Sequence, residues 1–173
     1  MTAQQQMMND MHQLPMRGNV DEDFAMLMKS HHRGAISMSQ HELEAGKDAD
    51  LKKMAATIVE EQKMELTKLY AIVSSLARTK KNYDPKKKDE GFAKISNDHM
   101  RMMMDMSKMD TSMPTDKQFV AMMIPHHLSA VYLAEGYLKY GANDRLLGMA
   151  REMIGKQKRE IDAFQIWMER NKD

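Results

Sequence analysis

The sequence predicts an all-α fold, an antiparallel four-helix bundle made of two tandem helical hairpins. Apolar residues recur in steps of four and three along four long stretches, a period typical of helices packed in a bundle, and the alternation expected of β-strands is absent. Short turns that contain glycine join these stretches in pairs. One set of residues also returns 95 positions later without gaps, which indicates that one hairpin has been duplicated.

The first hairpin is expected over residues 21–78 and the second over residues 115–173. In the first hairpin, one helix has Asn19 as its candidate N-cap and stops at Gly46, and the next helix begins near Asp50. The short turn between the two helices makes them antiparallel neighbours.

The second hairpin shows the same organisation. Its first helix is expected to begin at Thr115, where Thr-x-x-Gln118 resembles a capping box, and to stop at Gly141. Its second helix is expected to begin after Asn143, another candidate N-cap, and to continue to about Asn171.

The rest of the chain separates the hairpins or precedes them, and residues 1–173 are expected to form a single domain. Residues 1–20 and 99–114 are methionine-rich segments, each placed before one hairpin. Residues 79–98 are a basic connector, which is expected to be solvated. A nucleic-acid patch is the less favoured interpretation, because the lysine run is short and no aromatic array accompanies it.

Composition excludes several classes of function. The formal net charge is +1, which argues against a nucleic-acid or membrane-surface partner, and no apolar run is long enough to span a membrane. The chain has no cysteine, which excludes disulfides, thiolate zinc sites and cysteine catalysis. It has 22 methionines, an unusual number that requires an explanation.

The strongest functional signal is a motif of one methionine and two adjacent histidines that occurs once in each hairpin. The opposite helix of each hairpin adds a Gln-x-x-Glu pair on its apolar stripe. The motifs are Met28-x-x-His31-His32 and Met123-x-x-His126-His127, and the polar pairs are Gln62/Glu65 and Gln157/Glu160. A thioether one helical turn from an imidazole is a ligand set for a soft metal ion.

The polar pairs leave two interpretations open. A buried carboxylate without a partner costs several kcal/mol, so Glu65 and Glu160 both need one. The glutamine, glutamate and histidine side chains either form a hydrogen-bond network of their own or support a bound metal ion from behind. His32 and His127 fall one position away from the core line, which predicts that they face the rim of the bundle.

The two copies differ in detail. Pro125 precedes the second histidine pair, where the first copy has Ser30, and a proline inside a helix removes an amide and favours a kink. His41 has no counterpart in the second half and is expected to extend the first site through Met38. We therefore expect the two copies to bind metal with unequal affinity.

The methionine-rich segments are the second group of candidate ligands. A methionine inside a helical core is usually adaptable filler, but these methionines have polar and charged neighbours, so burial gains them little. Spacings of three and four would bring pairs together on one helical turn, with a histidine alongside. The candidates are Met8, Met11, His12, His99, Met103, Met106 and Met109. Chance enrichment or a sacrificial sink for oxidants is the alternative.

The ligand types predict copper. Thioethers select Cu(I), imidazole accepts either oxidation state of copper, and Ag(I) is expected to act as a mimic. Several ions per chain are expected. A ferritin-type di-iron centre needs more carboxylates than Glu65 and Glu160 supply, which disfavours ferroxidase chemistry.

The repeated pattern F-x-x-x-M-x-x-H-H-x-x-A, followed by G, L-x-x-M-A and Q-x-x-E, resembles a bacterial family of ferritin-like His-His domains of unknown function. With its methionine-rich segments, the chain is most similar to the CopM-type copper-binding proteins, which are periplasmic or secreted and support copper resistance. The likeness covers about residues 20–75 and 115–170. It implies a ferritin-like four-helix fold and copper handling outside the cytoplasm.

These observations together predict a non-enzymatic protein that sequesters or relays Cu(I) in the cell envelope. The expected location is periplasmic or secreted, with any signal peptide already removed. A copper exporter or another envelope copper protein is the expected partner. Two alternatives stay open: a ferritin-like di-metal or copper oxidase, and an interaction module that docks a partner through its methionines.

Overall fold

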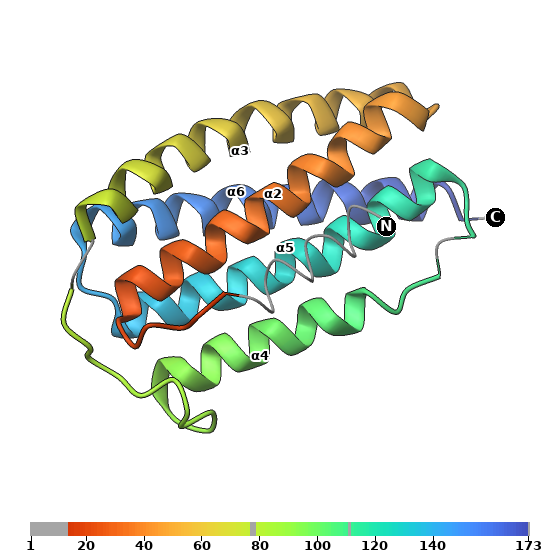
Figure 1. Cartoon of the computed structure of the whole chain (residues 1–173). Coiled ribbons are helices and arrows are strands. Elements are labelled where there is room, and N and C mark those ends of the chain that lie inside the picture. The colour runs from red at the N-terminus through yellow and green to blue at the C-terminus, as the bar shows by residue number, and fades with distance from the viewer. Residues whose placement is uncertain (1–13, 77–78, 111, 173) are drawn as a thin grey trace.

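The computed structural model describes residues 14–76, 79–110 and 112–172. Within them the chain is helical and has no strand, which confirms the predicted all-α class (Figure 1). The sequence pattern predicts four of the helices and misses the short one, so the described residues hold five. These helices are α2 (Val20–Ala45), α3 (Ala49–Leu76), α4 (Gly91–Met106), α5 (Thr115–Tyr140) and α6 (Asp144–Arg170).

The four long helices are arranged as two antiparallel hairpins. Helix α2 packs along α3, and α5 packs along α6. The hairpins meet through α2 and α5, and α4 covers the outer side of α5 (Figure 1). Helix α4 also contributes side chains directly to the core, so candidate ligands on it lie in the interior beside those of α2 and α5.

Two of the three predicted N-terminal caps are confirmed, and the third helix begins at Thr115 as predicted but without its predicted cap. The Asn19 side chain accepts a hydrogen bond from the amide of Glu22 at 3.2 Å, and Asn143 accepts one from the amide of Leu146 at 3.1 Å. The predicted capping box at Thr115 is wrong. Pro114 occupies the N-cap of α5 and makes no side-chain cap, because proline has no hydrogen-bonding side chain.

Both predicted glycine stops are confirmed, but not because of a left-handed backbone. Gly46 and Gly141 end α2 and α5 with φ of −69° and −74°, values that any residue adopts. Glycine is needed because the side chain four residues earlier folds over it. A Cβ would come within 2.2 Å of a Glu42 carboxylate oxygen at Gly46 and within 2.3 Å of the Tyr137 ring at Gly141.

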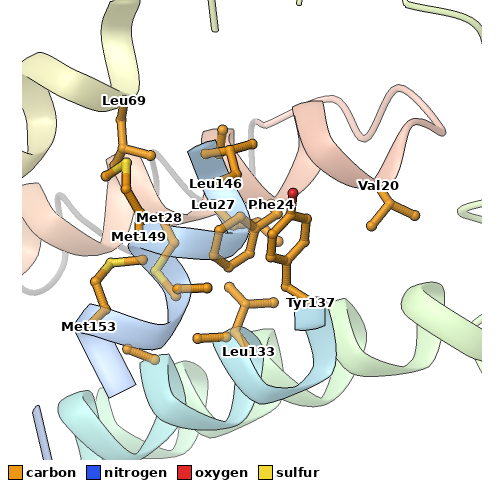
Figure 2. Packing of buried hydrophobic residues seen from close by; sticks show 14 of the residues in the cluster. Val20, Phe24, Leu27, Met28, Leu69, Leu133, Tyr137, Leu146, Met149 and Met153 are labelled. Carbon is orange, nitrogen blue, oxygen red and sulfur yellow. The ribbon is translucent and has the colours of Figure 1, made fainter. Parts of the chain in front are cut away.

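The core consists of two apolar clusters at different levels of the bundle. The first apolar cluster lies around the stacked rings of Phe24 and Tyr137, whose centroids are 3.9 Å apart (Figure 2). Helix α4 contributes Phe92 and two methionines to it. The second apolar cluster lies around the edge-to-face rings of Phe119 and Phe164.

A band of polar side chains, which we call the polar layer, separates the two clusters. Each long helix changes from one cluster to the other as it crosses this band: α2 gives Met28 to the first cluster and Ala35 to the second. Burial of the predicted polar stripe residues is confirmed for Gln62, Glu65 and Gln157, whereas Glu160 is half-buried. The layer consists of His31, His32, Gln62, Glu65, His126, His127, Gln157 and Glu160.

The connector between the hairpins differs from the prediction in two ways. Its second part, from Gly91, is the first half of α4. Its first part has exposed lysines but is held against the start of α2, since the amides of Asn82 and Tyr83 both donate to the carbonyl of Gly18. Gly18 has φ of +86°, a conformation that favours glycine. No helix among the described residues meets the length and hydropathy that crossing a bilayer requires.

Candidate metal centre

Five histidines lie in the interior with no exposed surface, and three of the helices supply them. Helix α2 contributes His31 and His32, α5 contributes His126 and His127, and α4 contributes His99. The prediction that His32 and His127 face the rim is therefore wrong. The apolar stripe of each helix is wide enough to bury both members of the pair, because three or four positions in every two turns face a bundle core.

His32 and His127 make the same contact in the two hairpins. Nε2 of His32 lies 2.7 Å from Oε2 of Glu65, and Nε2 of His127 lies 2.6 Å from Oε2 of Glu160. The histidine–glutamate part of the predicted hydrogen-bond network is therefore confirmed. It orients each imidazole so that its proton is on the nitrogen facing the carboxylate. The side-chain oxygens of Gln62 and Gln157, in contrast, are buried without a partner.

Glu65 also contacts a lysine, Lys156, in addition to its histidine. Nζ of Lys156 lies 3.1 Å from Glu65 and 3.3 Å from Glu61. Burial opposes ionisation of Glu65, but hydrogen bonds from His32 and Lys156 outweigh it and lower the pKa of this carboxyl. The position equivalent to Lys156 in the first hairpin is Glu61, so the two copies have different charges behind their histidines.

The other three histidines gather where α2, α4 and α5 meet. The ring centroids of His31 and His126 are 3.6 Å apart, and those of His31 and His99 are 5.7 Å apart. Burial lowers the pKa of all three, to about 4 for His99, and neighbouring imidazoles lower those of His31 and His126 further. The rings are neutral at pH 7, which is the form that binds metal ions.

The hydrogen bonds fix which nitrogen of most rings carries the proton. Nε2 of His31 donates to the carbonyl of His126 at 2.8 Å, and Nδ1 of His99 donates to the carbonyl of Ser129 at 3.0 Å. A carbonyl only accepts, so the second nitrogen of each ring is left with a free lone pair. The same holds for the two rings that face glutamates. The buried nitrogens without a partner are His31 Nδ1, His32 Nδ1, His99 Nε2, His127 Nδ1 and both nitrogens of His126.

A methionine sulfur and a serine lie among these rings. The Ser129 hydroxyl is 2.7 Å from the carbonyl of His126 and 3.0 Å from the sulfur of Met103, to either of which it can donate, and 3.3 Å from Nε2 of His31. Met103 is fully buried. Sequence reasoning misses Ser129, because it is a polar residue with no counterpart in the first hairpin, where Gly34 stands.

The remaining candidate ligands are dispersed. Met28 and Met123 are fully buried one turn before the histidine pairs, in the first and second apolar clusters respectively. Met38 lies in the second cluster, whereas His41 is exposed on α2.

On and after α4, Met106 is buried in the first cluster, and Met109 packs against that cluster. Three candidates, Met8, Met11 and His12, lie outside the described residues. Among the residues that are described, no three histidine, aspartate or glutamate side chains form a group that could hold a metal ion.

Comparison with known proteins places this geometry in a family. The family described as "Domain of unknown function (DUF305)" matches residues 1–73 and 72–168 of the chain. No curated protein sequence matches it significantly.

Solved structures share the fold. CopM in an Ag-bound form is 22% identical, with a TM-score of 0.67 over 88% of this chain and 97% of CopM. CopM in a Cu(II)-bound form is 23% identical, with a TM-score of 0.68 over 87% and 96%. A DUF305 protein from Streptomyces coelicolor, described as a "putative secreted protein", is 21% identical. Its TM-score is 0.62 over 86% of this chain and 91% of that protein. At these identities the likeness establishes the fold.

Proposed function

The chain belongs to the DUF305 family, and we propose that it is a copper-binding protein whose buried imidazoles and thioethers hold Cu(I). One observation carries the proposal. Four fully buried imidazoles each donate a hydrogen bond to a carbonyl or carboxylate oxygen. The second nitrogen of each of these rings is buried without a partner. A second-sphere acceptor behind the ring is what metal-binding histidines ordinarily have.

Energetics support a ligand role for these nitrogens. A buried polar atom without a partner costs about 1–3 kcal/mol, and most buried polar atoms in proteins are paired. Here six ring nitrogens lack partners in one region of the core. Five of them are free lone pairs, because one nitrogen of the neutral His126 ring carries a hydrogen. Bound cations would satisfy such lone pairs, and a neutral imidazole does not need to lose a proton to accept one.

The neighbouring donor favours a soft ion. The Met103 sulfur contacts the same serine hydroxyl as His31, and the Ser129 carbonyl holds His99. Thioether with imidazole suits Cu(I), and Ag(I) is its redox-inert mimic. CopM has been solved with Ag, with Cu(I) and with Cu(II), which supports the same assignment for a chain of the same fold.

The physiological role that fits is storage or relay in the cell envelope without catalysis. The four long helices act as a ferritin-like bundle to which α4 is added, and several partly independent donor groups suit a buffer that exchanges its ions. The secreted DUF305 relative supports a periplasmic or secreted location. An exporter or another envelope copper protein is the expected partner.

Metal titration tests the proposal. Cu(I), held by a chromogenic chelator under anaerobic conditions, and Ag(I), followed by calorimetry, are expected to bind with more than one ion per chain. Met103→Leu keeps the volume of the side chain and removes the sulfur, and His99→Leu removes an imidazole. Each is expected to weaken the tightest site by tenfold or more, about the loss seen when the surroundings of a metal site are altered.

Met149→Leu is the matched control, because Met149 is a buried methionine of the first apolar cluster on α6 (Figure 2). It is expected to bind metal as the unaltered chain does. Binding of no ion, or an equal loss in Met103→Leu and Met149→Leu, would contradict the proposal. Copper-dependent oxygen consumption in the unaltered chain would favour an oxidase instead.

A further inference from the structure

A surface pocket lined by three methionines lies between α4, Leu27 of α2 and the segment that precedes α2. Its volume is about 300 Å³. Met100 and Met104 line it from α4, and Met16 lines it from the segment that precedes α2. Residues of the connector complete the wall. None of these three methionines belongs to the buried histidine group.

The three thioethers are accessible from solvent. Met104 is 40% exposed, and Met16 and Met100 are half-buried. Met100 and Met104 are four residues apart on a helix, so they project from the same face on successive turns. Packing alone explains Met16 and Met100, which touch the first apolar cluster, but it does not explain the exposed Met104 beside them.

The charge and donor types of the pocket select against hard ions. Among the described residues, its lining includes no carboxylate and no imidazole, and its charged members are Lys88 and Arg101. The Arg101 guanidinium is paired with Asp98, which offsets its charge. Its oxygen donors are neutral, from Tyr83, Ser96 and Asn97, so a hard divalent ion would find no anionic ligand. A soft monovalent ion finds the thioethers that it prefers.

Helix α4 connects this pocket with the interior. Met100 follows His99, and Met104 follows Met103. The pocket donors therefore alternate in sequence with two interior donors: His99, which lies beside His31, and Met103, which contacts Ser129. We propose that Met16, Met100 and Met104 form a thioether site that captures a soft monovalent ion, Cu(I) or Ag(I), before it passes to His99 and Met103. The transfer step rests on the proposed function, whereas binding at the pocket can be tested alone.

Methionine methyl groups labelled with ¹³C give a direct test in the full chain. On addition of Ag(I) below one equivalent, the methyl signals of Met16, Met100 and Met104 are expected to shift together. The exposed Met64 on α3 is the internal control and is expected to stay unchanged. Zn²⁺ at the same concentration is expected to shift none of the three pocket signals.

The triple variant Met16→Leu, Met100→Leu, Met104→Leu keeps apolar volume and removes the sulfurs. It is expected to lose one Ag(I) per chain and to load the interior, reported by the Met103 methyl signal, more slowly. Met64→Leu is the matched variant and is expected to change neither. Circular dichroism and the midpoint of thermal unfolding confirm that each variant is folded.

The outcomes separate the two proposals. If the unaltered chain binds no Ag(I), the proposed function fails. If it binds Ag(I) at Met103 but the pocket signals do not shift, or if the triple variant keeps the same stoichiometry and loading rate, the capture site alone is overturned. Equal shifts with Zn²⁺ would overturn the selectivity for soft ions.

Discussion

Ser129 determines how the central histidine group is held together. Its hydroxyl contacts the carbonyl of His126, the sulfur of Met103 and the ring of His31, and its carbonyl accepts the proton of His99. One residue of α5 therefore orders donors from α2, α4 and α5. The hydroxyl and the carbonyl do different things, and a side-chain substitution separates them.

We expect Ser129→Ala to destabilise the fold by about 1 kcal/mol, because it removes a buried hydroxyl that has partners. Ser39→Ala is the matched control: Ser39 is also fully buried, but its hydroxyl has no partner, so its loss is expected to be neutral or stabilising. Urea unfolding measures both. The proton on Nδ1 of His99 is expected to stay in place in Ser129→Ala, since its acceptor is main chain, and ¹⁵N shifts of the ring report it. A proton moved to Nε2 would contradict this assignment.

The histidine pairs also show what a sequence predicts at the scale of a residue. The spacing of His31 and His126 against Gln-x-x-Glu is enough to predict a buried polar group with candidate ligands. Ser129 and Lys156 are not predictable in the same way, because their roles depend on which helices meet. The Ser129 hydroxyl contacts Met103 and His31, which lie 26 and 98 positions away, and Lys156 contacts Glu65, which lies 91 positions away.

At the scale of the element, the two hairpins are fastened to each other at both ends by equivalent contacts. Oδ1 of Asp21, at the start of α2, accepts from the amides of Ala142 and Asn143 in the turn between α5 and α6. Oδ1 of Asp116, 95 residues later, accepts from the amides of Lys47 and Asp48 in the turn between α2 and α3. Each turn is therefore held by the first helical turn of the other hairpin.

The side chain beside each of these contacts differs between the two ends, and this gives a pH-dependent prediction. Tyr137 donates to Asp21 at one end, whereas Glu42 lies near Asp116 at the other. Burial, and then Asp116, raise the pKa of Glu42 from 4.5 to about 8. The folded chain thus keeps a proton that the unfolded chain loses above pH 4.5, so Glu42 lowers stability progressively as pH rises from about 4.5 to about 8.

Glu42→Gln removes this titration. We expect the free energy of unfolding of the variant, relative to the unaltered chain, to rise between pH 5 and pH 8, as measured by urea denaturation at several pH values. Glu44→Gln, an exposed substitution on the same turn of α2, is the control and is expected to shift stability equally at all pH values. A parallel shift in Glu42→Gln would contradict the raised pKa.

Helix α4 is the element that sequence reasoning misses, although its signal is present. Phe92, Ser96, His99, Met103 and Met106 follow the same steps of four and three as the long helices, and all five are buried. The boundary predicted between residues 98 and 99 cuts this stripe in two. That boundary follows from charge runs and methionine content, which change along α4, whereas the period of its apolar residues stays the same.

At the scale of the whole molecule, the two apolar clusters stabilise the bundle by ordinary packing. The polar layer between them contains buried polar atoms without partners, which lower its stability. Both nitrogens of the fully buried His126 ring lack partners. Functional sites often contain residues that lower the stability of the fold and are not compensated by local contacts. The layer is therefore where stability and metal binding should oppose each other.

His126→Leu tests this opposition. Leucine replaces the ring by an apolar side chain at the boundary between the clusters, and the carbonyl that accepts from His31 is unaffected. We expect the free energy of unfolding to increase by about 1–3 kcal/mol, since that is the cost of burying unsatisfied polar groups. The unfolding midpoint is expected to rise by about 2–4 °C for each kcal/mol. Ag(I) affinity is expected to fall. A variant that is less stable and binds Ag(I) unchanged would contradict the ligand role.

The same layer makes the stability of the whole molecule depend on pH in the acid range. Burial first, and then neighbouring imidazoles, lower the pKa of His31 and His126 well below 6.5, and burial lowers that of His99 to about 4. Below pH 6.5 the unfolded chain takes up protons on these histidines that the folded chain does not, so their contribution to stability is complete above that value and falls as the pH falls toward 4. Glu42 acts in the opposite direction over the same range, because its pKa is raised to about 8. Metal binding is then expected to persist below pH 6, where an exposed imidazole with a pKa near 6.5 would be protonated, for as long as the fold survives.

Urea unfolding between pH 7 and pH 4, with and without Ag(I), separates the two effects. In the Glu42→Gln background, which removes the opposing titration of Glu42, the metal-free chain is expected to lose stability steadily below pH 6.5. Adding His126→Leu is expected to reduce this loss, since one titrating ring is gone. Ag(I) binds only the folded form with neutral rings, so it is expected to move the onset of this loss to lower pH, by an amount that grows with its concentration. A metal-free profile of Glu42→Gln that is flat from pH 7 to pH 5 would mean that the histidines are not neutral and buried, and the ligand assignment would fail with it.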